Sequence, residues 1–191
     1  MMDKSNGYEP LAHEFMTRRS RTIGAKSVRE WSTRLPRGAN VLELGCGSGV
    51  PVSQVLADEG FQLYAIDASA TLLEAYRTRF PDAHVECAAV EESAFFNRTF
   101  DGIVAWGLMF LLPADSQRIV IAKAARALAP QGKFLFTAGA EANEWPDVMT
   151  RRMSISLGAD EYRTILRSHG LTVEGELDDE GENHYYLAAR P

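Results

Sequence analysis

Three glycines stand within five residues in the segment 41–49, which reads VLELGCGSG. The apolar residues before Gly45 predict a buried strand, and the apolar spacing after Pro51 predicts a helix. Glycine permits positive φ and lets backbone N–H groups approach a ligand without an intervening side chain. A helix amino terminus adds partial positive charge, which favours a carboxylate or a phosphate. The segment therefore predicts a ligand-binding turn.

An acidic residue follows at a spacing that suits the same ligand. Asp67 ends the next apolar run and lies 22 residues after Gly45. A carboxylate at that place can accept the hydroxyl groups of a ribose, as it does in dinucleotide sites and in other adenosine sites. The alternative is that Asp67 only caps the helix that begins near Ser69. Together, the turn and Asp67 predict a ligand that contains adenosine.

The glycine spacing separates two kinds of adenosine ligand. A dinucleotide fingerprint places glycine at its first, third and sixth positions, and the sixth position counted from Gly45 is Val50. The turn is GxGxG instead, and no GK[ST] follows, which excludes a triphosphate P-loop. An NAD(P)-dependent oxidoreductase stays as an alternative that Val50 disfavours.

Short apolar runs alternate with amphipathic helical patterns along the chain, which predicts an α/β fold with a parallel sheet. The expected parallel strands are 41–44, 62–66, 83–87, 102–106 and 133–137. After a helix over 160–169, the runs 171–176 and 185–189 are joined by an acidic loop too short for a helix, which predicts an antiparallel hairpin. The expected fold is a three-layer, doubly wound, Rossmann-like sheet of seven strands.

With these elements placed, VLELGCGSG resembles the first motif of class I S-adenosylmethionine-dependent methyltransferases, and YAIDAS resembles their second. The family's sheet also has five parallel strands and a terminal antiparallel pair. The segments 100–107 and 130–134 resemble the fourth motif and the turn before the fifth strand. The resemblance covers residues 38–138 and, in outline, the last hairpin.

The resemblance implies S-adenosylmethionine as the cofactor and S-adenosylhomocysteine as its product. Glu43 would lie near the methionine amino group, Asp67 would hold the ribose, and Trp106 would face the sulfonium. Many relatives have an aspartate after the third strand, where this chain has Ala88-Ala89-Val90, so the backbone N–H of Val90 is expected to serve the adenine. The implied cofactor contacts are Glu43, Gly45, Cys46, Gly47, Gly49, Asp67, Ala68, Ala89, Val90 and Trp106.

Composition narrows the functional classes. The chain has 191 residues and a net charge of −6, which disfavours a nucleic-acid partner. Cys46 and Cys87 lack metal-site spacing, so no metal is expected. The chain has neither an apolar run of roughly 18 residues nor an apolar leader, so we expect no membrane span and a cytoplasmic location. Oligomeric state stays open.

We expect one methyltransferase domain with four parts. These are an N-terminal helical cap (1–37), a cofactor-binding core (38–138), a substrate lid (139–157) and a C-terminal helix and hairpin (158–191). The alternative for 139–157 is an ordinary helix–loop excursion. Residues of the cap that could close the site are Tyr8, His13, Arg21 and Trp31.

The sequence says less about the methyl acceptor and the catalytic residue than about the cofactor. The apolar run WGLM at 106–109 replaces the Asn/Asp-Pro-Pro-Tyr motif of amino- and base-methylating relatives, which favours a small, partly apolar acceptor and in-line displacement.

No catalytic residue is assigned; the histidines are His13, His84, His169 and His184. The run 18–21 either is a solvated helix end or contacts an anionic substrate or the cofactor carboxylate. A catalytically decayed cofactor-binding module or partner subunit is the alternative function.

Overall fold

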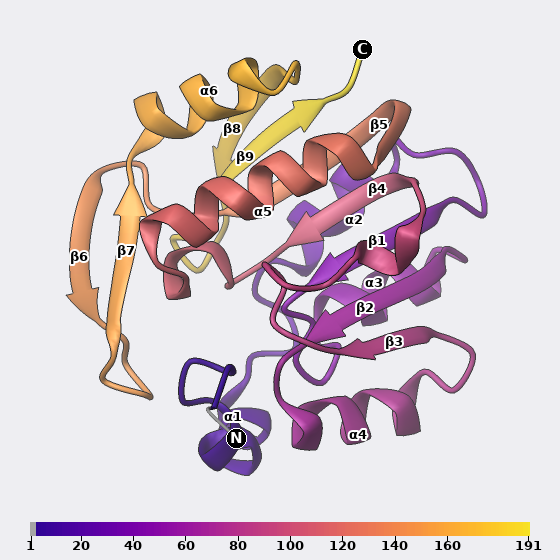
Figure 1. The fold of residues 1–191 in the computed structure, drawn as a ribbon. Coiled ribbons are helices and arrows are strands. Elements are labelled where there is room, and N and C mark those ends of the chain that lie inside the picture. The colour runs from indigo at the N-terminus through magenta and orange to yellow at the C-terminus, as the bar shows by residue number, and fades with distance from the viewer. Residues whose placement is uncertain (1–2) are drawn as a thin grey trace.

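A seven-stranded sheet forms the centre of the computed structural model, which describes residues 3–191 (Figure 1). Its strand order is β3-β2-β1-β4-β5-β9-β8. The strands are β1 (Asn40–Leu44), β2 (Gln62–Asp67), β3 (His84–Cys87), β4 (Phe100–Ala105), β5 (Leu128–Thr137), β8 (Thr172–Asp178) and β9 (His184–Ala189). β1 to β5 pair in parallel, whereas β9 pairs antiparallel with both β5 and β8. The expected fold is confirmed.

The strand order places the ligand site. From β1 the chain winds outward to β2 and β3, and then returns to add β4 on the other side of β1. In an open parallel sheet, ligands bind outside the carboxyl ends of the strands at such a reversal. Gly45 follows the last residue of β1, and Trp106 follows the last residue of β4. The glycine turn and Trp106 therefore border the same crevice.

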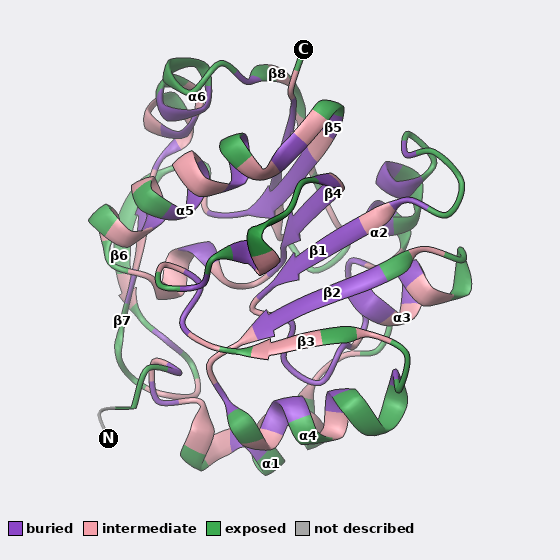
Figure 2. Cartoon of the chain, turned by 45° about the vertical axis from the view of Figure 1, so that its right-hand side comes forward, coloured by how far each residue is buried: buried purple, intermediate pink, exposed green. Residues whose placement is uncertain are grey.

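Helices cover both faces of the sheet (Figures 1 and 2). α5 (Ala114–Ala127) and α6 (Ala159–Ser168) pack on one face, and α2 (Ala25–Ser32), α3 (Val52–Asp58) and α4 (Ala70–Arg79) pack on the other. α1 (Ala12–Arg18) lies beside α4, beyond the carboxyl ends of the strands. The short 3₁₀ turns are η1 (Glu9–Leu11), η2 (Phe95–Asn97) and η3 (Met109–Leu111).

The alternating side chains of the strands divide the interior into two clusters. Leu42 and Leu44 of β1 point into the cluster under α5 and α6, whereas Val41 points into the cluster under α2 and α3. All three side chains are fully buried, and Figure 2 shows the central strands buried along their length. Burial on both faces explains why these strands are continuous apolar runs.

The segment 139–157 forms an element that the sequence did not predict. β6 (Ala142–Pro146) and β7 (Met153–Leu157) pair as an antiparallel hairpin outside the main sheet (Figure 1). The helix–loop alternative is therefore wrong. β6 is largely exposed, so it lacks the apolar pattern that marks the other strands. Asp147 organises the hairpin turn, because its Oδ1 accepts the N–H groups of Met149 and Thr150.

No helix within residues 3–191 is long and apolar enough to cross a membrane.

The packing at Gly49 yields a prediction about stability. Gly49 has φ of +82°, and a Cβ there would lie 2.3 Å from a ring carbon of Phe80. Gly60 has nearly the same φ, +81°, but a Cβ there would meet nothing within 4 Å. We expect Gly60→Ala to cost about 1 to 2 kcal/mol from backbone strain alone. Gly49→Ala should cost roughly 1 to 3 kcal/mol more, because the Phe80 and Tyr76 rings must move.

Urea unfolding of both variants measures the difference. Equal losses of stability would mean that the Phe80 and Tyr76 rings move aside at no cost in free energy. The interior beneath the glycine turn would then be less closely packed than we infer.

Candidate functional site

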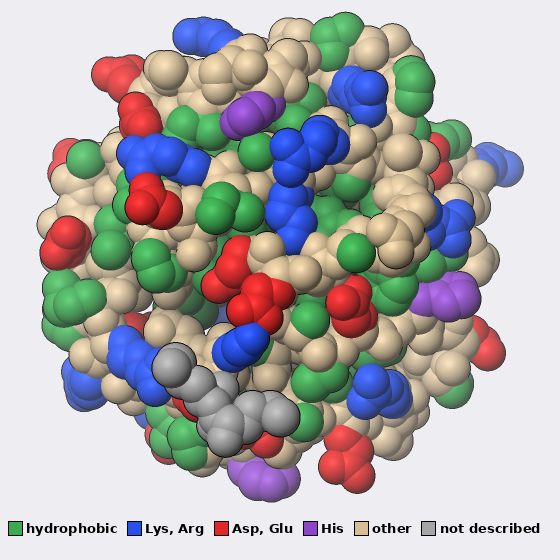
Figure 3. Space-filling model, viewed as in Figure 1, with side chains coloured by type: hydrophobic (Ala, Val, Ile, Leu, Met, Phe, Trp, Pro, Cys, Tyr) green, Lys and Arg blue, Asp and Glu red, His purple; other side chains and the backbone are tan. Residues whose placement is uncertain are grey.

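A cavity of about 1050 Å³ opens at the carboxyl ends of the central strands. One side is formed by the glycine turn, the end of β2 and the loop after β3. The other side is formed by the loops after β4 and β5 and by the β6–β7 hairpin. Figure 3 shows the surface hollowed on this face, with hydrophobic and acidic side chains bordering the opening. The volume slightly exceeds the usual upper range for a small-ligand pocket, so the cavity has room for two small molecules.

The glycine turn is fixed to the neighbouring strand. The N–H groups of Gly45 and Cys46 both donate to the Ile66 carbonyl, at 2.8 and 3.1 Å. Gly45 and Gly47 have φ of +69° and +54°, which glycine adopts without strain. A Cβ at Gly47 would lie 3.3 Å from the Phe15 ring, and one at Gly45 would lie 2.9 Å from Leu108. The turn therefore presents bare backbone to the cavity between two apolar side chains.

Asp67 connects the turn to the start of α4. Its Oδ2 accepts the Gly47 N–H at 2.7 Å, and its Oδ1 accepts the Ser69 N–H at 2.8 Å. Burial raises the pKa of this carboxyl group, and the backbone donors Ser69 and Gly47 oppose the rise. A carboxylate oxygen can accept more than one hydrogen bond, so both oxygens retain capacity for the hydroxyls of a ligand.

The residues predicted to bind the cofactor divide into two groups. Those that line the cavity are Gly45, Gly47, Asp67, Ala68, Ala89, Val90 and Trp106. Glu43, Cys46 and Gly49 lie behind the lining, and their side chains or backbone pack beneath the turn. The structure thus places seven of the ten at the cavity, and the remaining three support the turn.

Glu43 is the buried acid of this second group. Its carboxylate accepts a short hydrogen bond from the Ser53 hydroxyl, which also contacts the Tyr76 hydroxyl at 2.7 Å. Burial raises the pKa of Glu43 to about 8, and the nearby Arg19 guanidinium acts in the opposite direction. At neutral pH, much of the population therefore holds a proton at Glu43.

Lys123 shapes the loop after β3, where Ala88 and Ala89 stand in place of an acid. Its Nζ donates to the carbonyls of Val90, Glu91 and Ser93, at 3.0, 2.9 and 2.5 Å. An ammonium with three carbonyl acceptors uses all of its donors. The loop is held in one conformation from the α5 side, and its residues 88–91 line the cavity.

Arg19 is the residue of the run 18–21 that stacks on Trp106, and its sequence context did not single it out. Its guanidinium lies 4.0 Å from the Trp106 ring centroid and 5.2 Å from that of Phe15. Nε donates to the Val50 carbonyl at 3.2 Å, and the residue lines the cavity. Burial lowers its pKa to about 10, which leaves it charged at neutral pH. No carboxylate within residues 3–191 forms an ion pair with it.

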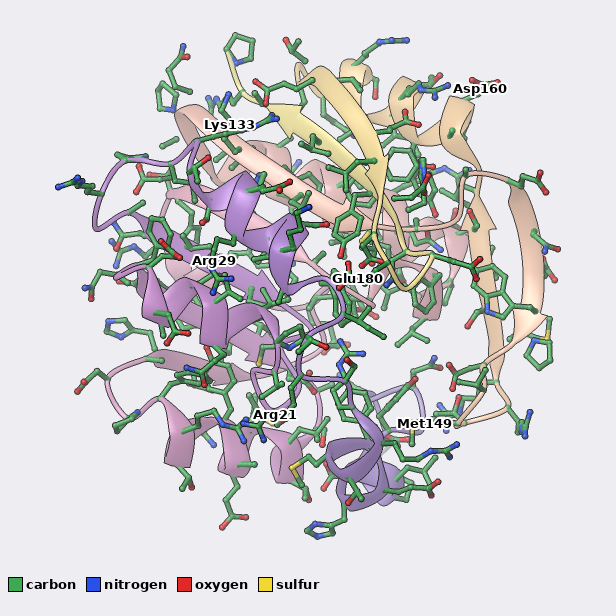
Figure 4. The ribbon with its side chains drawn as sticks, turned by 180° about the vertical axis from the view of Figure 1, so that it is seen from behind. Arg21, Arg29, Lys133, Met149, Asp160 and Glu180 are labelled. Atoms are coloured by element: carbon green, nitrogen blue, oxygen red, sulfur yellow. The ribbon has the colours of Figure 1, made fainter. Side chains whose placement is uncertain are left out.

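The N-terminal segment closes one side of the cavity. The Glu9 carboxylate accepts the hydroxyls of Ser69 and Thr71, and the Tyr8 hydroxyl donates to Asp147 at 3.1 Å. Tyr8 lines the cavity, as its place in the cap predicted, but His13, Arg21 and Trp31 lie outside that lining. Figure 4 shows Met149, on the hairpin turn, close to α1.

The histidines provide no free imidazole nitrogen at the cavity. His13, His84 and His169 lie outside the lining, and His84 stacks on Tyr64 at 4.5 Å. His184 does line it, but its Nδ1 contacts Asp178 at 2.7 Å and its Nε2 contacts Glu176 at 3.1 Å. Residues 3–191 also contain no cluster of three potential metal ligands.

Comparison with known proteins relates this geometry to a family. Residues 41–132 match the model of a family described as a methyltransferase domain. An O-methyltransferase of Penicillium expansum is 25% identical over 165 residues, which are 79% of this chain and 59% of that protein. A malonyl-[acyl-carrier protein] O-methyltransferase of Enterobacter lignolyticus is 34% identical over 115 residues, 59% of this chain and 44% of that protein. The chain thus spans about half the length of these curated relatives.

The fold extends further than the sequence similarity. The structure of an amino pentose methyltransferase from Micromonospora echinaspora, solved with S-adenosylmethionine, superposes with a TM-score of 0.74. The superposition covers 95% of this chain and 96% of that chain at 15% identity. The expected resemblance to class I methyltransferases is confirmed.

The buried Glu43 yields a prediction about stability and pH. Its pKa in the folded state lies above the ordinary value of 4.5, so the folded state retains a proton that the unfolded state releases. Stability should therefore fall as pH rises from about 4.5 to about 8, by up to a few kcal/mol. The glutamine of Glu43→Gln has no proton to release, so the stability of this variant should change less with pH over the same range.

Urea unfolding at a series of pH values measures the slope. The exposed Glu74→Gln on α4 is the matched control and should keep the wild-type slope. A Glu43→Gln profile as steep as that of the wild type would show that other groups produce the dependence.

Proposed function

We propose that the protein transfers a methyl group from S-adenosylmethionine to a small organic acceptor, on the premise that residues 41–132 match the model of the methyltransferase-domain family. One observation carries the proposal. The glycine turn with Asp67 and an apolar wall border the same cavity. Both reactants of a methyl transfer would lie in that one space.

The residues at the turn fit the cofactor. Asp67 has oxygens available for the two ribose hydroxyls, and Gly47 offers a surface that a side chain would obstruct. Ala68, Ala89 and Val90 would pack around the adenine, whose N–H contact would come from the backbone of Val90. The methionine carboxylate would bind Arg19, whose guanidinium has no acidic partner in residues 3–191.

The ammonium of the methionine part would approach Glu43. The Glu43 carboxyl is buried and its pKa is raised to about 8. A positive charge nearby favours the ionised form, so Glu43 would release its proton when the cofactor binds. This role requires the carboxylate to turn from Ser53 or to act from behind the lining.

The cofactor supplies a methyl group on a sulfonium, which is already activated for displacement by a nucleophile. The protein must then align the acceptor and exclude water. Trp106 and Leu108, at the end of β4, would cover the reacting region, and the hairpin would close it. No protein base is assigned, in agreement with the engagement of both His184 nitrogens.

The other half of the cavity supports a partly apolar acceptor. Phe110 and Trp145 pack with their ring centroids 5.7 Å apart, and Met149 and Val148 of the hairpin turn lie at the opening. Aromatic walls bind organic ligands through apolar contact. The cavity is a concave site rather than a flat surface, which favours a small molecule over a macromolecule.

Calorimetric titration with S-adenosylhomocysteine and, separately, with NADH tests the cofactor. We expect micromolar binding of the former and no binding of NADH. Asp67→Ala should weaken S-adenosylhomocysteine binding by roughly 100-fold, because charged hydrogen bonds to both hydroxyls are lost.

The exposed Asp82→Ala is the control for charge and should bind as the wild type does. Binding of NADH alone, or of neither compound, would refute the proposed cofactor. Binding of S-adenosylhomocysteine without methyl transfer to any acceptor would favour a catalytically decayed module.

The role of Arg19 can be tested with a ligand that lacks the amino-acid group. S-adenosylhomocysteine carries the carboxylate, and methylthioadenosine does not. Arg19→Ala should weaken S-adenosylhomocysteine binding roughly 30-fold, because a charge-assisted contact is lost, and should leave methylthioadenosine binding within a factor of about 3. Equal weakening of both ligands would show that Arg19 only supports the shape of the site.

A further inference from the structure

A chain of hydrogen bonds begins at Trp106 and leads away from the cavity. The indole Nε1–H of Trp106 donates to the Tyr185 hydroxyl at 2.5 Å, and that hydroxyl donates to Asp179 Oδ2 at 2.7 Å. Trp106 and Tyr185 are both buried. Since an indole N–H is only a donor, the direction of both hydrogen bonds is fixed. Trp106 is therefore held in one orientation by residues of the C-terminal hairpin.

The acidic loop that ends this chain is itself well ordered by hydrogen bonds. Asp179 Oδ1 accepts the N–H groups of Gly181 and Asn183, at 2.8 and 3.0 Å. The neighbouring Glu180 carboxylate accepts the Gly24 N–H at 3.3 Å, and Figure 4 labels Glu180 on this loop. The loop between β8 and β9 thus has internal contacts that fix Asp179 before it meets Tyr185.

Gly24 shows how closely this group is packed. A Cβ at Gly24 would lie 2.7 Å from the Tyr185 hydroxyl and 2.8 Å from the Trp106 ring. Gly24 is also the N-cap of α2 with φ of +81°, so both its conformation and its surroundings require glycine. The Trp106 ring therefore has no room to tilt toward α2.

The Arg19 guanidinium stacks over the Trp106 ring, at 4.0 Å from the ring centroid. Arg19 has one hydrogen bond to protein, from Nε to the Val50 carbonyl, so the stacking on Trp106 fixes the plane of its terminal amino groups. A tilt of the indole would move those groups. The orientation of Arg19 consequently depends on Tyr185, whose hydroxyl accepts the hydrogen bond from the Trp106 indole N–H.

We infer that Tyr185 and Asp179 are positioning residues, which hold Trp106 so that Arg19 presents its guanidinium to a carboxylate ligand in the cavity. Neither residue touches the ligand. The inference rests on the proposed function, in which that carboxylate belongs to the amino-acid part of the cofactor.

The test compares two ligands on Tyr185→Phe, with S-adenosylhomocysteine and methylthioadenosine as the probes. Phenylalanine keeps the ring and leaves the Trp106 N–H without its acceptor, so the indole must shift. We expect S-adenosylhomocysteine binding to weaken roughly tenfold and methylthioadenosine binding to stay unchanged. Asp179→Asn retains an acceptor for the Tyr185 hydroxyl and should weaken S-adenosylhomocysteine binding less than Tyr185→Phe does.

Tyr162→Phe is the matched control. Tyr162 is also a buried tyrosine, and its hydroxyl donates to Gln117 at 2.6 Å, on the α5 and α6 side of the sheet. This variant loses a buried hydrogen bond of the same kind and should bind both ligands as the wild type does. Weaker binding of both ligands by Tyr185→Phe, or of S-adenosylhomocysteine by Tyr162→Phe, would overturn the inference in favour of a general stability effect.

A double substitution tests whether Tyr185 acts through Arg19. In the Arg19→Ala background, Tyr185→Phe should produce no further loss of S-adenosylhomocysteine affinity. Additive losses would overturn the inference. Failure of the wild type to bind either ligand would instead refute the proposed function, so the two failures are distinguishable.

Discussion

The candidate site depends on the hydrogen bond from the Gly47 N–H to the Asp67 carboxylate. This contact joins the turn after β1 to the end of β2, and it is possible only because the two strands are parallel neighbours whose carboxyl ends meet. Asp67 also accepts the Ser69 N–H, which orients the entrance to α4. One carboxylate therefore fixes the glycine turn, a strand end and a helix start before any ligand is present.

Residues far apart in the sequence surround this centre. Arg19 comes from the end of α1, Trp106 from the end of β4, and Tyr185 from β9. Arg19 stacks over the indole ring of Trp106, and the Tyr185 hydroxyl accepts the hydrogen bond from the indole N–H. The β8–β9 hairpin completes the seven-stranded sheet and also supports Trp106, a residue of the cavity wall.

The sequence predicted the parts of this structure that follow from local pattern. The continuous apolar run of β1 needs burial on both faces, and Asp67 at the end of the next strand needs only a parallel sheet to meet the turn. The β6–β7 hairpin could not be predicted because its outer strand is exposed and polar, so its pairing shows no periodicity. Arg19 could not be separated from Arg18 and Arg21, since only the position of Trp106 in the folded chain decides which arginine stacks on its ring. Glu43 lies beneath the turn and outside the cavity lining, because the alternation of side chains along β1 directs it toward Ser53.

The N-terminal segment contacts both halves of the cavity wall, through Glu9 at the start of α4 and Tyr8 at the hairpin turn. Asp3 forms an ion pair with Arg152, and Lys4 forms one with Glu92, so the described chain begins at the rim of the opening. Pro191 lies at the opposite end of the molecule (Figure 1). The first described residues, Asp3 and Lys4, therefore lie beside the opening. An affinity tag or fluorescent label is therefore better attached at the carboxyl end, where it leaves the passage of ligands undisturbed.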